Sequence, residues 1–96
     1  MNLHERMEVV NSEYGKFELI QNPRSKRRDL HAFLLLDELV PADKEALLVS
    51  AAEHDVYYID VDVEKLDAAI TDEQVIELVR CGISYSGEYD CLMKFP

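Results

Sequence analysis

The stretch ITDEQVIELVRCG, residues 70–82, contains the signals for both ends of a helix. Thr71 and Gln74 have the spacing of a capping box, in which each side chain accepts a hydrogen bond from the other residue's backbone N–H. Gly82 stands where a residue in the left-handed conformation often ends a helix. Because start and stop signals are both present, this stretch predicts a helix over about 72–81.

The residues before this helix follow the two-residue period of a strand. In VYYIDVDV, residues 56–63, Tyr57 begins an apolar set of odd-numbered residues, and Tyr58, Asp60 and Asp62 fall on the other face. We expect Tyr57 to lie in the core and the acidic face to meet water.

The residues after the helix, ISYSGEYDCLMKF, predict two further strands around a turn at residues 86–88. In the last strand the odd-numbered residues alternate with Asp90, Leu92 and Lys94. We expect the odd-numbered set to face the core: Tyr89, Cys91, Met93 and Phe95.

Residues 26–39 have apolar side chains at three- and four-residue spacing, which predicts a second helix. Asn22 or Ser25 is its expected cap, and Pro41 stops it. His31, within its apolar part, is expected to be a buried core residue.

Two segments leave alternatives open. Residues 42–52 have helical propensity, but a strand there would turn near residues 52–55 and pair with the next strand, and we favour this hairpin. Residues 7–20 fit two short strands around a turn, with one helix over residues 3–9 as the alternative.

Together these elements predict an α+β fold: a small antiparallel sheet of four to six short strands with two main helices packed on one face. The 96 residues, with three Gly and three Pro, predict a single domain over residues 1–96. No apolar run approaches the roughly 18 residues of a membrane span, and the N-terminus does not resemble a signal peptide. A cytoplasmic location and no membrane partner are therefore expected.

Charge is distributed unevenly along the chain. Residues 1–28 hold six bases and four acids, net +2, whereas residues 29–96 hold sixteen acids and four bases, net −12. An acidic body of this kind repels nucleic acid and attracts basic proteins. The alternative is that the charge serves only solubility.

The stretches SAAEHDVYYIDVD and ITDEQVIELVRCGISYSGEYDCLMKF, within about residues 30–95, resemble small acidic proteins of phage and mobile-element genomes. The resemblance implies an accessory protein rather than a housekeeping enzyme. It implies no particular site residues.

The acidic stretch has three interpretations: a solvated sheet face or helix cap, a docking surface, or a metal site. Two carboxylates on one strand do not by themselves converge on a cation, so we expect no metal site and no cofactor. Tyrosine is common at binding hot spots, and Tyr58 shares the acidic face. The expected partner-binding residues are Asp55, Tyr58, Asp60, Asp62, Glu64, Asp67, Asp72 and Glu73.

The first hypothesis is therefore a non-enzymatic protein that docks on a basic, nucleic-acid-binding host protein, as an inhibitor of the anti-CRISPR or anti-restriction type. A self-associating structural or regulatory module, such as a homodimer, is the alternative. Its basic contact would be the cluster at the predicted helix start, Arg24, Lys26, Arg27 and Arg28.

A small metal-dependent enzyme is the remaining hypothesis. The sequence lacks a nucleophile motif, a phosphate-binding glycine loop and metal-ligand spacing, so we expect no catalytic residues. His54 is expected at an exposed turn rather than in a catalytic site. Cys81 and Cys91 are expected to be buried, reduced thiols.

Overall fold

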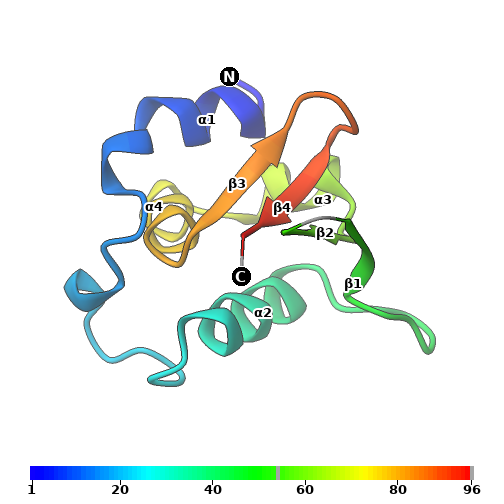
Figure 1. The fold of residues 1–96 in the computed structure, drawn as a ribbon, viewed down its shortest axis with the longest axis horizontal. Helices are drawn as coiled ribbons and strands as arrows, with labels where there is room; N and C mark the ends of the chain where they lie inside the picture. Colours follow the sequence, from blue (N-terminus) through cyan, green and yellow to red (C-terminus); the bar gives the residue numbers. More distant parts are fainter. Residues whose placement is uncertain (54, 96) are drawn as a thin grey trace.

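The computed structural model describes residues 1–53 and 55–95. Helices occupy the first half of the chain, and a hairpin, two helices and a second hairpin follow (Figure 1). The elements are α1 (Leu3–Val9), the single turns η1 (Asn11–Glu13) and η2 (Phe17–Leu19), α2 (Arg28–Leu39), β1 (Val49–Glu53), β2 (Val56–Ile59), α3 (Val63–Ala69), α4 (Asp72–Arg80), β3 (Ile83–Ser86) and β4 (Cys91–Lys94).

Helix α4 forms where its sequence signals place it. The Thr71 hydroxyl accepts the N–H of Gln74 at 3.1 Å, and the Gln74 side chain accepts the N–H of Thr71 at 2.9 Å. Gly82 follows the helix with a φ of 89°, which a residue with a Cβ rarely adopts. The predicted helix is confirmed, and its last residue is Arg80.

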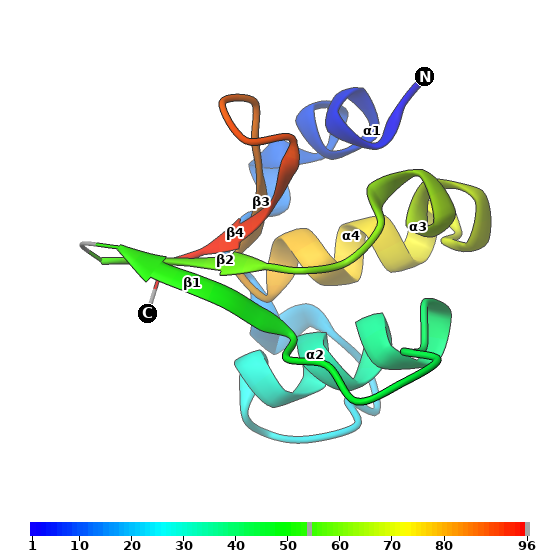
Figure 2. The ribbon, with the colours of Figure 1, turned by 90° about the vertical axis from the view of Figure 1, so that its right-hand side faces the viewer.

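The four strands form one antiparallel sheet in the order β1-β2-β4-β3. The hairpin predicted for residues 47–61 is present as β1 and β2. All four helices lie on one side of the sheet, and the β1–β2 hairpin projects away from them (Figure 2). The predicted α+β fold is confirmed.

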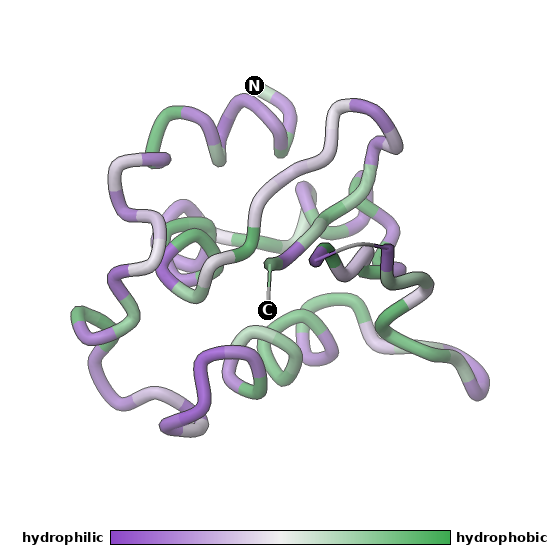
Figure 3. Tube along the Cα trace, viewed as in Figure 1, coloured by the Kyte–Doolittle hydropathy of each residue, from purple (hydrophilic) through white to green (hydrophobic). Residues whose placement is uncertain are grey.

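The core lies between the helices and the inner face of this sheet. Helix α2 contributes Ala32, Leu35 and Leu36, which are fully buried. The tube in Figure 3 alternates between hydrophobic and hydrophilic along α2, and it is hydrophilic in the loop before α2 and at the β3–β4 turn. The other fully buried apolar residues include Ile59, Leu66, Leu78, Ile83 and Leu92.

The N-terminal segment differs from the favoured prediction. Residues 7–20 form no strand; instead α1 begins with a capping box between Asn2 and Glu5. Leu3 and Met7 are four residues apart, and both are buried. Residues four apart lie on the same face of a helix, so α1 packs with Leu3 and Met7 turned toward the core. The helical alternative for residues 3–9 was therefore the correct one.

Strand β4 faces the opposite way from the prediction. Leu92 pairs with Ile59 on one side and Tyr85 on the other, and it is fully buried. Lys94 shares that inner face. Cross-strand partners point to the same side of a sheet, so pairing with Ile59 decides which residues of β4 turn inward. The odd-numbered set therefore turns away from the core, and Tyr89 and Phe95 are exposed.

Two further expectations need correction. Tyr57 lies on the inner face but at its margin, where it is 38% exposed. Helix α2 begins at Arg28 without a side-chain cap, because the Ser25 hydroxyl accepts the N–H of Arg27 outside the helix and Asn22 lies further back. His31 is buried as expected.

No helix formed by the described residues is long and apolar enough to cross a membrane.

Candidate functional site

The outer face of the sheet, away from the helices, carries a pair of tyrosine rings. Tyr58 projects from β2, and Tyr89 projects from the turn that leads into β4. Their ring centroids are 5.2 Å apart with the planes at 79°, the edge-to-face arrangement that aromatic pairs favour. Tyr89 is 55% exposed, so one face of the pair meets solvent.

The tyrosine pair lines a shallow hollow between the β1–β2 hairpin and β4. Its volume is about 380 Å³. We call it the tyrosine hollow; its lining residues are Ser50, Ala51, Glu53, Tyr58, Tyr89 and Cys91. Ala51 lies directly across from Tyr58 in the pairing of β1 with β2, so a small side chain stands beside the tyrosine ring.

Carboxylates surround the tyrosine hollow closely enough to act on its ionisable groups. Burial raises the pKa of Tyr58, and Tyr89, Glu53 and Glu88 raise it further. The pKa of Tyr89 is raised mainly by Glu88 and then by Glu53. Both hydroxyls therefore stay protonated at neutral pH, and the negative charge around them resides on carboxylates.

The thiol in the hollow has the same surroundings. Burial raises the pKa of Cys91, and Asp90 and Asp60 raise it further. Burial raises the pKa of Cys81 to about 12. Because the thiolate is the reactive form, neither environment favours a nucleophile. Both cysteines are free, as expected, although Cys91 is only partly buried.

Only some of the expected partner-binding residues lie near the tyrosine hollow. Asp60 follows β2, and its backbone N–H donates to the carbonyl of Leu48 at 2.7 Å while its side chain is exposed. Asp62 is the N-cap of α3, and its Oδ1 accepts the N–H groups of Glu64 at 3.0 Å and Lys65 at 3.1 Å. Asp62 is thus a helix cap, as one of the three interpretations expected.

Two other expected residues are held by a cation from α1. Arg6 donates to Asp67 Oδ1 at 2.8 Å and to Asp72 Oδ1 at 3.0 Å, and it also donates to the carbonyls of Asp67 and Ile70. The pKa of Arg6 is raised, chiefly by its hydrogen bond to Asp67. These two carboxylates join α1 to the α3–α4 junction, so their charge is partly neutralised within the chain.

The remaining expected residues are dispersed. Asp55 is exposed at the β1–β2 turn, Glu64 is exposed in the first turn of α3, and Glu73 is exposed in the first turn of α4. His54 lies outside the described residues. The structure therefore does not gather the eight residues into one patch; it gathers Tyr58 with carboxylates that the sequence analysis had not selected.

The basic cluster lies before and at the start of α2. Arg24, which precedes α2, pairs with Glu38 near the end of that helix. Arg28 lies over the ring of Phe17, with its guanidinium carbon 5.8 Å from the centroid. Lys26 and Arg27 are exposed and form no ion pair with a described residue. Of the four cations, only Arg24 is paired with a carboxylate among the described residues.

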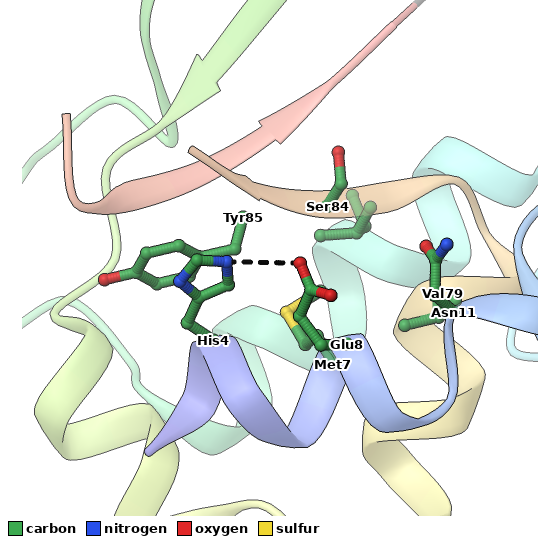
Figure 4. A pocket seen from close by; sticks show the side chains of 8 residues that line it. His4, Met7, Glu8, Asn11, Val79, Ser84 and Tyr85 are labelled. Carbon is green, nitrogen blue, oxygen red and sulfur yellow. Dashed lines mark ion pairs between the residues drawn. The ribbon is translucent and has the colours of Figure 1, made fainter. Parts of the chain in front are cut away.

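A much smaller pocket lies between α1 and β3 (Figure 4). The His4 ring stacks on Tyr85 with centroids 4.7 Å apart, and His4 Nε2 lies 3.5 Å from Glu8 Oε1. The volume of this pocket is about 70 Å³. Ligand pockets usually have about 300–1,000 Å³, so this one fits little more than water.

Among residues 1–53 and 55–95, no three His, Cys, Asp or Glu side chains gather in a way that would hold a metal ion.

Sequence reasoning missed Tyr89, Glu53, Glu88 and Asp90 as members of the site. The turn GEYD, with two acids around a tyrosine, was an available signal. The sequence does not reveal that β4 pairs with β2, and this pairing brings the turn beside Tyr58.

No protein-family model, curated protein or solved structure matches this chain.

Proposed function

We propose that this chain is a non-enzymatic protein-binding protein that docks the tyrosine hollow on an arginine- and lysine-rich surface of a partner protein. The observation that carries the proposal is the Tyr58–Tyr89 pair within reach of the charges of Glu53 and Glu88. Cations bind the faces of aromatic rings, and the neighbouring carboxylates add a direct charge interaction.

Long-range attraction supports the same kind of partner. The net charge of −10 increases the encounter rate with a basic surface and opposes approach to nucleic acid. A protein whose basic surface normally holds nucleic acid would have this surface occupied by carboxylates instead. Together with the resemblance to phage and mobile-element proteins, this favours an accessory inhibitor of the anti-CRISPR or anti-restriction type.

The test measures binding of a nona-arginine peptide by fluorescence anisotropy. Tyr58→Ala and Tyr89→Ala should each weaken binding about 2- to 30-fold, because a cation on an aromatic ring contributes roughly 0.5–2 kcal/mol. Tyr14→Ala is the control, since Tyr14 is also exposed but lies outside the hollow. Equal affinities for all three variants and the wild type would refute the proposal.

The carboxylates are tested by a matched pair of substitutions. Glu88→Gln and Glu18→Gln remove the same unit of charge from exposed positions. Glu88→Gln should weaken peptide binding more, because Glu88 acts on both tyrosines and Glu18 does not. If the two variants lose the same affinity, only the net charge matters and the hollow is not the docking site.

Self-association is the second candidate, and the exposed, unpaired cations Lys26 and Arg27 favour it. They would meet the acidic body of another copy. Light scattering should then show a dimer at low salt that Lys26→Glu with Arg27→Glu abolishes. A monomer at every concentration would remove this candidate.

A further inference from the structure

The other side of the sheet holds a second cavity, between the start of α2 and strands β1, β2 and β4. Its volume is about 470 Å³, within the range of small-molecule sites. We call it the Lys94 cavity; its lining residues are Arg28, Asp29, Phe33, Val49, Tyr57 and Lys94. Tyr57 and Tyr58 are neighbours on β2 and point to opposite faces, so this cavity and the tyrosine hollow share no residue.

Lys94 is the feature of this cavity that most needs a partner. Its exposed fraction is 8%, and it lies on the inner face because it pairs with Tyr57 and Ile83. Nζ donates to the carbonyl of Phe95 at 2.9 Å, and it forms no ion pair with a carboxylate of the described residues. The ammonium is partly buried and has one carbonyl as its acceptor, so an anion supplied from outside would be favoured here.

Other positive groups meet at the same place. Arg28 lines the cavity, and α2 begins there without a side-chain cap. The N–H groups of Arg28 and Asp29 have no acceptor among the described residues, and in the first turn of α2 only the Asp29 carboxylate offsets the positive end of the helix dipole. Arg28 and Lys94 both line the cavity. Both also lower the pKa of the buried Cys81 thiol, against the larger effect of burial.

One carboxylate also lines the cavity. Asp29 Oδ1 accepts the N–H of Leu30 at 2.8 Å, and its side chain forms no ion pair with a described cation. Two cations and one anion leave the lining with a formal charge of +1. That balance suits a ligand with a single negative charge, and the walls formed by Phe33, Val49 and Tyr57 suit an apolar body.

We propose that the Lys94 cavity binds a small organic carboxylate, with the carboxylate at Lys94 and Arg28 and the apolar body against Phe33 and Tyr57. This site is independent of docking at the tyrosine hollow. It adds a small-molecule ligand to a molecule whose surface is otherwise suited to a basic protein.

The probes are phenylacetate, its neutral analogue phenylacetamide, and acetate, each titrated into the ¹⁵N-labelled protein and followed by amide chemical shifts. Phenylacetate should shift the amides of Tyr57 and Lys94 and bind at least about tenfold more tightly than either of the others, which corresponds to one unit of 1.4 kcal/mol. Equal binding of phenylacetate and phenylacetamide, no binding of phenylacetate, or shifts confined to the tyrosine hollow would each overturn the proposal.

Variants then test the ammonium itself. Lys94→Met keeps most of the apolar stem and should weaken phenylacetate binding about tenfold, whereas Lys94→Arg should retain it. Lys65→Met is the control, because Lys65 is exposed on α3. This variant should bind phenylacetate as tightly as the wild type does.

Two further measurements keep the result interpretable. Lys94→Met should unfold in urea at a concentration no lower than the wild type, since it removes a buried charge that has no carboxylate partner. Tyr58→Ala, which disturbs docking on the other face, should leave phenylacetate binding unchanged. A folded Lys94→Met variant with wild-type affinity for phenylacetate would show that the ammonium does not bind the ligand.

Discussion

At the scale of single residues, the Arg6 side chain makes four long-range hydrogen bonds, more than any other side chain in the described part of the chain. Its guanidinium donates to two carboxylates and two carbonyls from residues 67–72, more than sixty positions away in sequence. Its side chain is only 15% exposed, so these hydrogen bonds are partly shielded from water. The end of α3 and the start of α4 are thereby joined to α1.

We predict that Arg6→Gln lowers the free energy of unfolding by about 2 kcal/mol, because a charge-assisted hydrogen bond contributes roughly 1.5–3 kcal/mol and the variant leaves two acids unpaired. Urea denaturation followed by circular dichroism measures the change. Arg24→Gln is the control: its pair with Glu38 is more exposed and should contribute no more than about 1 kcal/mol. Equal losses for the two variants would contradict the assignment of Arg6 as a structural cation.

At the scale of elements, Asp62 is the N-cap that begins α3. Its Oδ1 accepts two backbone N–H groups at the start of α3, which an asparagine side chain can also do. Asp62→Asn should therefore keep the free energy of unfolding within about 0.5 kcal/mol of the wild type, and Asp62→Ala should lower it by about 1 kcal/mol. Urea denaturation of both variants is the measurement. If Asp62→Asn is as unstable as Asp62→Ala, the charge rather than the cap is what stabilises α3.

The elements that could be predicted from the sequence are those whose signals are local. Thr71, Gln74 and Gly82 are close in the chain, so the start and the end of α4 were readable without any tertiary contact. The alternation of residues 56–59 predicted β2. The acidic residues beside this strand predicted a binding face that includes Tyr58.

What could not be predicted depends on contacts between distant segments. The two faces of β4 both read as plausible core, since Leu92 alternates with Cys91 and Met93, and only pairing with Ile59 decides between them. The same pairing brings Tyr89 to Tyr58 and turns Lys94 inward. Helix α1 was only the second alternative, although the capping box of Asn2 and Glu5 and the four-residue spacing of Leu3 and Met7 are local signals for it.

At the scale of the whole molecule, two electrostatic effects oppose each other. Ion pairs such as those of Arg6 with Asp67 and of Arg80 with Glu13 attract, and added salt weakens them. The remaining acids repel one another, and salt relieves that repulsion. The balance is set by composition, because twenty acids face only ten bases.

We therefore predict that repulsion dominates, so that raising NaCl from about 20 to about 200 mM increases the free energy of unfolding measured in urea. Over this range the screening length falls from roughly 20 Å to below about 10 Å, shorter than the 28–32 Å extents of the molecule. Distant acids then no longer repel, whereas the partly buried pairs of Arg6 are screened much less. Arg6→Gln, which loses attraction but keeps the repulsion, should gain more from salt than the wild type does. A fall in stability with salt for both proteins would mean that attraction dominates, and that the acidic charge is arranged to hold the fold together rather than left available for a basic partner.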